Sequence, residues 1–69
     1  MNLEQEILTI AMEECAELTQ ELSKQIRFGD NRKNLLKEMC DLLCMVELIG
    51  DLYDINVDEV SKGIETKQQ

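Results

Sequence analysis

Apolar residues return every three or four positions from Leu3 to about Arg27. This interval matches the turn of an α-helix, and no stretch alternates in the way of a half-buried strand. Gly29 follows as a candidate C-terminal cap, and Arg27 is placed to interact favourably with the negative end of the helix dipole. The pattern therefore predicts one helix of about seven turns. Its apolar positions are Leu3, Ile7, Leu8, Ala11, Met12, Cys15, Leu18, Leu22 and Ile26.

Two more helices are predicted after the connecting segment GDNRKN, in which Asp30 or Asn31 is a candidate N-cap. The second helix runs to about Tyr53. Asn56 and Glu59 then have the spacing of a capping box, which predicts the start of a short third helix. The last four residues, TKQQ, are expected to fray. The apolar line of the third helix is Val57, Val60 and Ile64.

The second helix is apolar nearly all round, and its only clearly polar sector holds Lys37, Glu47 and Asp51. Such a helix must be covered on several sides, and three helices of one short chain cannot supply that cover. We therefore expect residues 1–69 to form a single all-α domain, a three-helix subunit that assembles into an oligomeric helical bundle. The expected assembly is a homodimer or a homotetramer.

Acidic residues interrupt the apolar faces of both long helices at the same spacing. The segment ECAEL contains Glu14 and Glu17, and the segment EMCDL contains Glu38 and Asp41. Residues three apart are neighbours on one helix face, so each helix presents a pair of carboxylates. Glu38 and Asp41 lie among apolar residues, which an ionised carboxylate avoids unless it is paired or binds a metal. For Glu14 and Glu17 an ordinary solvated role is a serious alternative.

Two helices packed antiparallel across a short connection can bring these four carboxylates together. Four such groups do not stay ionised side by side without a cation between them. Ligands that are all oxygen favour a hard divalent ion such as Mg²⁺, with Mn²⁺ as a substitute. The sequence has no histidine, which excludes the Glu-x-x-His pairs of di-iron helical bundles.

Composition narrows the range of partners. Seven Lys and Arg stand against fifteen Asp and Glu, for a formal net charge of −8. This charge argues against nucleic acid or an anionic membrane as the main partner. No apolar run approaches the ~18 residues of a membrane span, and no signal peptide is recognisable.

Three cysteines, Cys15, Cys40 and Cys44, are too few and too dispersed for a zinc-ribbon pattern. We interpret them as reduced thiols in the core of a cytoplasmic protein, in bacteria or in a phage-infected host. A soft-metal site at Cys40 and Cys44 is a weaker alternative, because two ligands without a histidine rarely suffice.

Taken in order, the two acidic motifs resemble those of the MazG-like all-alpha nucleoside triphosphate pyrophosphohydrolases. That family carries E-E-x-x-E on one helix and E-x-x-D on the next. Here the motifs read EECAE at 13–17 and EMCD at 38–41, and the segment SKQIRFGD between them is also similar to short phage and bacterial members. The resemblance covers roughly residues 8 to 65. Many relatives have a further helix before the first motif, so we expect this subunit to complete its bundle with a second chain.

The resemblance implies Mg²⁺-dependent hydrolysis of a nucleoside triphosphate to the monophosphate and pyrophosphate. It assigns metal binding to Glu14, Glu17, Glu38 and Asp41. In that chemistry a motif glutamate, which we take to be Glu14, accepts the proton of the attacking water. Candidate phosphate contacts are Lys24 and Arg27, although Arg27 is equally suited to capping. The only aromatic residues, Phe28 and Tyr53, are suited either to stacking on a base or to the core.

Two other functions stay open at this point. An acidic helical interaction or regulatory module, without catalysis, accounts for Glu47, Asp51 and Asp58 on solvated faces, but it gives no reason for Glu38 and Asp41 among apolar neighbours. A family member that binds nucleotide or metal without turnover would carry the same four ligands. The nucleobase and the sugar are not specified, because relatives with different substrates share the metal motif.

Overall fold

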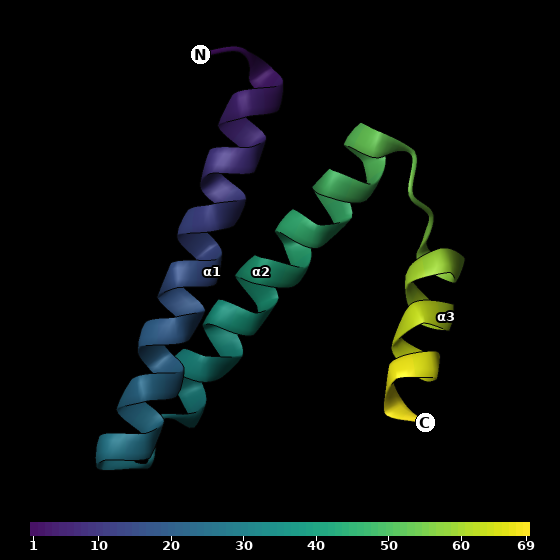
Figure 1. Ribbon diagram of the computed structural model, residues 1–69. Helices are drawn as coiled ribbons and strands as arrows, with labels where there is room; N and C mark the ends of the chain where they lie inside the picture. The colour runs from purple at the N-terminus through teal and green to yellow at the C-terminus, as the bar shows by residue number, and fades with distance from the viewer.

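The computed structural model describes residues 1–69, and it is all-helical with no strands, as predicted. Helix α1 spans Leu3–Phe28, α2 spans Arg32–Tyr53 and α3 spans Val57–Gln68. Figure 1 shows α1 and α2 as an antiparallel hairpin, closest at their connected ends, with α3 folded back on the other side of α2. None of the three helices combines the length and the apolar character that crossing a membrane requires.

The helix ends follow local hydrogen bonding. Gly29 caps α1 with φ 69°, a left-handed value that favours glycine, and its N–H donates to the carbonyl of Gln25. At the N-terminus of α1, Asn2 and Gln5 form a capping box that was not predicted. The predicted box of Asn56 and Glu59 is present at the start of α3, with both hydrogen bonds at 2.9 Å.

Two predicted boundaries were wrong. The N-cap of α2 is Asn31, one of the two predicted candidates, although its side chain makes no capping bond. Since α2 therefore begins at Arg32, the connection is shorter than GDNRKN. The TKQQ segment does not fray: α3 continues to Gln68 and leaves only Gln69 outside. Lys67 lies in this last turn, where its charge complements the helix dipole.

The fold is open and thin. Its Cα atoms extend 39 × 38 × 15 Å, and their radius of gyration is 14.1 Å, against about 11 Å for a compact domain of this length. Only α1 and α2 pack along each other, and the only buried apolar residues are Ala11 and Met45. The predicted apolar face of α1 is therefore only partly covered: Leu18 is half-buried and Leu22 is exposed.

The tight connection between α1 and α2 is held by Asn31. Its side-chain amide donates to both the backbone carbonyl (2.9 Å) and the carboxylate Oε2 (2.6 Å) of Glu21. Its backbone N–H donates to Oε1 of Gln25 at 2.9 Å. The amide of Asn31 is the main reason that the pKa of Glu21 lies below its ordinary value, and the Lys24 ammonium 3.2 Å away lowers it further.

We expect Asn31→Ala to lower the melting temperature by several degrees at neutral pH. A carboxylate whose folded-state pKa is lowered stabilises the fold above its ordinary pKa, and this contribution is lost as the pH falls through the lowered value. The difference between the variant and the wild type should therefore shrink in acid. Circular-dichroism melts at equal protein concentration test this, with the exposed Gln20→Ala as the control. If Asn31→Ala lowered the melting temperature equally at neutral pH and at acid pH, the proposed link to Glu21 would be contradicted.

Candidate metal centre

Four acidic residues from two helices meet between α1 and α2. Glu14 and Glu17 lie one turn apart on α1, and Glu38 and Asp41 lie one turn apart on α2. One carboxylate oxygen from each lies within 4.8 Å of all the others. These are the four residues that sequence spacing selected, so the structure brings the whole predicted set together.

Burial differs across the cluster. Glu38 is 8% exposed, and Met45, two turns further along α2, is 7% exposed. Glu14 and Asp41 are half-buried, and Glu17 is exposed. Glu38 is the only buried charged residue of the subunit. The cluster is thus buried at Glu38, partly accessible at Glu14 and Asp41, and open to solvent at Glu17.

Two carboxylate oxygens of the cluster, Oε2 of Glu14 and Oε2 of Glu38, are buried without a hydrogen-bond partner. Such groups carry an unmet desolvation cost. Burial raises the pKa of Glu38, and the neighbouring Glu17 carboxylate raises it further by hydrogen bonding to its protonated form. A cation between the helices would satisfy both oxygens and remove the repulsion, and the donor set of four carboxylates suits a hard divalent ion.

Lys37 is a component of the site that sequence reasoning missed. Its ammonium lies 2.9 Å from Oδ2 of Asp41 and 3.4 Å from Oε1 of Glu38, and these two carboxylates raise its pKa, Asp41 most strongly. Its position one turn before Asp41 is the signal that could have revealed it. Because the Lys37 side chain is 67% exposed, it neutralises part of the cluster from the solvent side and is free to swing away.

The two candidate phosphate contacts lie outside the cluster. The ammonium of Lys24 pairs with Glu21 at 3.2 Å, roughly 10 Å beyond Glu17 along α1. The guanidinium of Arg27 lies 5.2 Å from the centre of the Phe28 ring, and both side chains are exposed at the end of the hairpin. The structure therefore leaves these cations on the same helix as the cluster without joining them to it.

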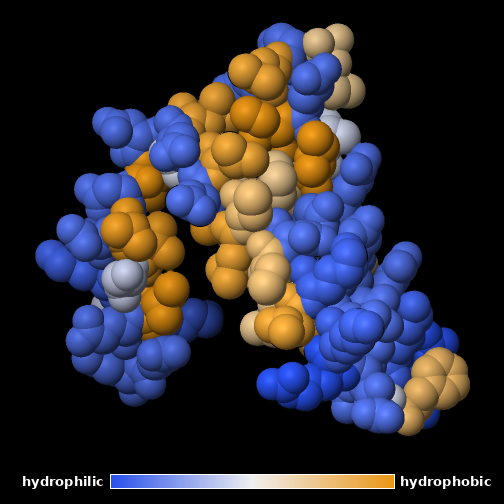
Figure 2. Space-filling model, turned by 180° about the vertical axis from the view of Figure 1, so that it is seen from behind, coloured by the Kyte–Doolittle hydropathy of each residue, from blue (hydrophilic) through white to orange (hydrophobic).

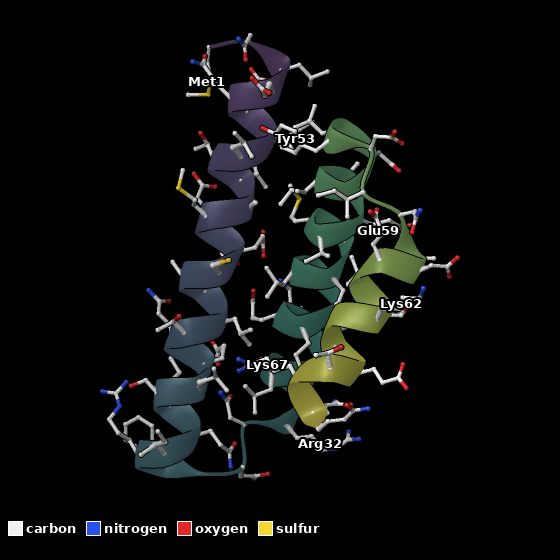
Figure 3. The ribbon with its side chains drawn as sticks, turned by 45° about the vertical axis from the view of Figure 1, so that its right-hand side comes forward. Met1, Arg32, Tyr53, Glu59, Lys62 and Lys67 are labelled. Atoms are coloured by element: carbon white, nitrogen blue, oxygen red, sulfur yellow. The ribbon has the colours of Figure 1, made fainter.

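Tyr53 closes the far end of the hairpin. Its hydroxyl donates to Oε2 of Glu4 at 3.1 Å, and Figure 3 shows it pointing from α2 to the first turns of α1. Partial desolvation raises the pKa of this phenol, and the Glu4 carboxylate adds to the effect. The hydrogen bond of Tyr53 thus joins the end of α2 to the start of α1. Phe28, the other aromatic residue, is 77% exposed and is not part of a core.

The cysteines do not lie where the sequence indicated. All three are free thiols, but Cys15, Cys40 and Cys44 are exposed in the subunit rather than buried in its core. The reason is the thinness of the fold, since neither long helix has a neighbour on these sides.

Comparison with known proteins shows no matching family model, no matching curated protein and no matching solved structure. The residues of the site and their motifs are therefore the basis for assigning a function.

Glu38→Gln tests the centre through stability. Mg²⁺ or Mn²⁺ should raise the melting temperature of the wild type by several degrees more than NaCl of equal ionic strength, because a ligand of the folded state stabilises it. The variant should lose most of this shift. Glu13→Gln removes the same charge from an exposed neighbour outside the cluster, and it should keep the shift. If divalent ions and NaCl act alike on the wild type, there is no metal centre here.

The metal-free proteins provide a second comparison. Because the folded-state pKa of Glu38 is raised, the stability of the wild type should fall as the pH rises from the ordinary carboxyl range through that raised value. Glu38→Gln lacks the ionisation and should be the more stable metal-free protein at neutral pH. Thermal melts in a chelator across this range give the comparison.

Proposed function

We propose that this protein is a Mg²⁺-dependent nucleoside triphosphate pyrophosphohydrolase of the MazG-like type. The observation that carries the proposal is the meeting of Glu14, Glu17, Glu38 and Asp41 within 4.8 Å of one another. The motif order that led to the resemblance and the geometry of the hairpin select the same four side chains.

The donor set supports Mg²⁺, with Mn²⁺ as a substitute. Carboxylate oxygens are the protein ligands that these ions prefer, and Mg²⁺ in such sites also takes oxygens from substrate phosphates. When bound, the ion supplies charge neutralisation at the phosphates and a lowered pKa for water, so that water attacks the α-phosphorus at neutral pH. The bond from the α-phosphorus to the bridging oxygen breaks, and pyrophosphate and the nucleoside monophosphate leave.

The residues of this chain then take distinct roles. Glu38 and Asp41 would hold the ion from α2, and Glu14 and Glu17 would hold it from α1. Glu14, whose buried Oε2 has no partner, accepts the proton of the attacking water. Lys37, which pairs with Glu38 and Asp41, would give up these contacts to a cation bound by the same carboxylates.

The cations near the end of the hairpin are assigned to the substrate. Lys24 and Arg27 lie on α1 beyond Glu17 and contact phosphate oxygens in this proposal. A nucleotide that reached them would have to displace Glu21 from Lys24, since these two side chains are paired in its absence.

The chain works in this proposal as a cytoplasmic homodimer or homotetramer. Support comes from the exposure of large apolar side chains along all three helices, which a lone subunit would leave in water. The helical bundle is completed by further copies of the same subunit.

One observation favours the alternative function, an acidic helical interaction or regulatory module without catalysis. Lys37 already compensates part of the charge of the cluster through Asp41 and Glu38, so the hairpin has an internal counter-charge without any metal. The two unpaired buried oxygens of Glu14 and Glu38 argue against this alternative, because a purely structural cluster gains nothing from leaving them unsatisfied.

Asp41→Asn separates the two functions. The substitution preserves shape and removes one ligand charge, so pyrophosphate release from a confirmed substrate should fall by about a hundredfold or more, while the helical spectrum is unchanged. The substrate is found first by measuring pyrophosphate release over the common ribo- and deoxyribonucleoside triphosphates with and without Mg²⁺. Asp58→Asn makes the same change on the exposed surface of α3 and should leave activity intact. Full activity in Asp41→Asn would remove Asp41 from the metal centre.

A further inference from the structure

Helix α2 carries a second apolar face that α1 does not cover. Its large members are exposed: Leu36 by 53%, Met39 by 50%, Leu43 by 63% and Val46 by 40%. With Gly50 they recur at intervals of three, four, three and four, the spacing at which two helices pack side by side as a coiled coil. We call these five positions the α2 seam. The seam lies on a different side of α2 from the buried Glu38 and Met45.

The two halves of the seam have different surroundings. The C-terminal half, Leu43, Val46 and Gly50, forms the floor of a groove of about 650 Å³ between α2 and α3. Apolar side chains of α3 form its other wall: Val57, Val60 and Ile64. Glu47 and Asp51 also line the groove and make it acidic. Figure 2 shows the apolar surface along α2 and on the inner side of α3. The N-terminal half of the seam has no such wall.

The exposed area indicates how much surface a partner has to cover. The subunit exposes 5801 Å², whereas a compact monomer of this mass exposes about 4,450 Å². The excess of about 1,350 Å² exceeds the roughly 800 Å² that each partner contributes to a standard stable interface. Two chains that bury this excess against each other would form an interface of about 2,700 Å² in total, which is in the range of obligate homodimers.

The charges on α2 indicate the identity and direction of that partner. α1 and α3 both have acidic residues in the first turn and a basic residue in the last, as their dipoles favour. α2 has neither. It begins with Arg32 and Lys33, carries Asp51 in its last turn and is followed by Asp54 as its C-cap, the unfavourable order for its own dipole. A second α2 running antiparallel would place its basic end beside the acidic end of the first, at both ends of the pair.

We propose that two copies of this chain form a two-fold symmetric dimer in which their α2 helices pack antiparallel along the α2 seam. The N-terminal half of each seam, Leu36 and Met39, fills the acidic groove of the other copy together with Arg32. In antiparallel packing, the coiled-coil a position of one helix lies opposite the d position of the other. This register puts Leu36 opposite Val46, Met39 opposite Leu43, and Arg32 opposite Gly50, next to the Ile55 carbonyl that occupies the Cβ direction of Gly50.

The same register fixes the residues that flank the seam. Lys33 of one copy comes beside Glu47 of the other, and Cys40 comes beside Cys40 of the other across the two-fold axis. Cys44 points away from the axis on the polar side of α2. The interface, its antiparallel direction and its register go beyond the proposed function, which specifies only a homodimer or homotetramer, and the tests below need neither nucleotide nor metal.

Sedimentation and light scattering at micromolar concentration test the assembly. The wild type should be dimeric, or a tetramer built from such dimers, and a folded monomer would overturn the proposal. Leu43→Glu should dissociate the dimer. Ile26→Glu introduces the same charge at an apolar residue of α1 that is 87% exposed, and it should leave the dimer intact. Equal dissociation by both variants would show that the interface is not the α2 seam.

A charge exchange tests the antiparallel direction and does not depend on whether a dissociated subunit stays folded. Lys33→Glu and Glu47→Lys should each weaken the dimer, by roughly tenfold for two symmetric pairs. The double variant should recover wild-type affinity, because opposite charges again face each other. In a parallel dimer Lys33 of one copy and Glu47 of the other would stay fourteen residues, about 21 Å, apart, and the double variant would show no recovery. That result would overturn the antiparallel arrangement.

Thiol cross-linking tests the register with residues that the chain already contains. With Cys15→Ser and Cys44→Ser, the remaining Cys40 should give a covalent dimer with a short bis-maleimide. With Cys15→Ser and Cys40→Ser, the remaining Cys44 should give little. All three thiols are exposed, so both variants are accessible to the reagent. Cross-linking through Cys44 in preference to Cys40 would overturn the register.

Discussion

Repulsion among four carboxylates at the contact between α1 and α2 is the constraint on which the rest of this structure depends. The helices approach one another there with one oxygen of each carboxylate inside a 4.8 Å cluster, and one of them, Glu38, is buried. A hairpin can hold that geometry only if its charge is compensated by the Lys37 ammonium, by a proton on Glu38 or by a bound cation. The position of α2 against α1 thus depends on which positive charge, from Lys37, a proton or a cation, compensates the four carboxylates.

This constraint explains why so little of the subunit is a conventional core. Residues that would otherwise fill the hairpin with apolar side chains are acids, and Ala11 and Met45 are the only buried apolar residues left. A chain of this size rarely folds on so small a core without a metal, a disulfide or a partner. All its cysteines are free, so the proposed ion and the proposed second copy are the remaining sources of stability.

Sequence alone predicted what depends on near neighbours in the chain. The three helices, the cap at Gly29, the Asn56 box and the pairing of acids on each helix all follow from periodicity and short spacings. Exposure of Cys40 and Leu22 could not be predicted in this way, because it depends on which helices pack together. The contacts of Asn31 with Glu21 were also missed, since they join residues ten positions apart across a turn. Lys37 was assigned only to a solvated sector of α2. Helical periodicity does not show which way its side chain turns, and contacts with Asp41 and Glu38 decide this.

The two faces of α2 link the proposed centre to the proposed dimer. Glu38 and Asp41 alternate along the helix with Leu36, Met39 and Leu43, so a rigid helix cannot move one set without the other. A partner helix along the α2 seam would fix the rotation of α2, and with it the direction in which Glu38 and Asp41 face α1. Preorganised ligands bind a metal more tightly than ligands that must be ordered on binding. Dimerisation would therefore strengthen metal binding without contributing a ligand, and by linkage the metal would strengthen the dimer.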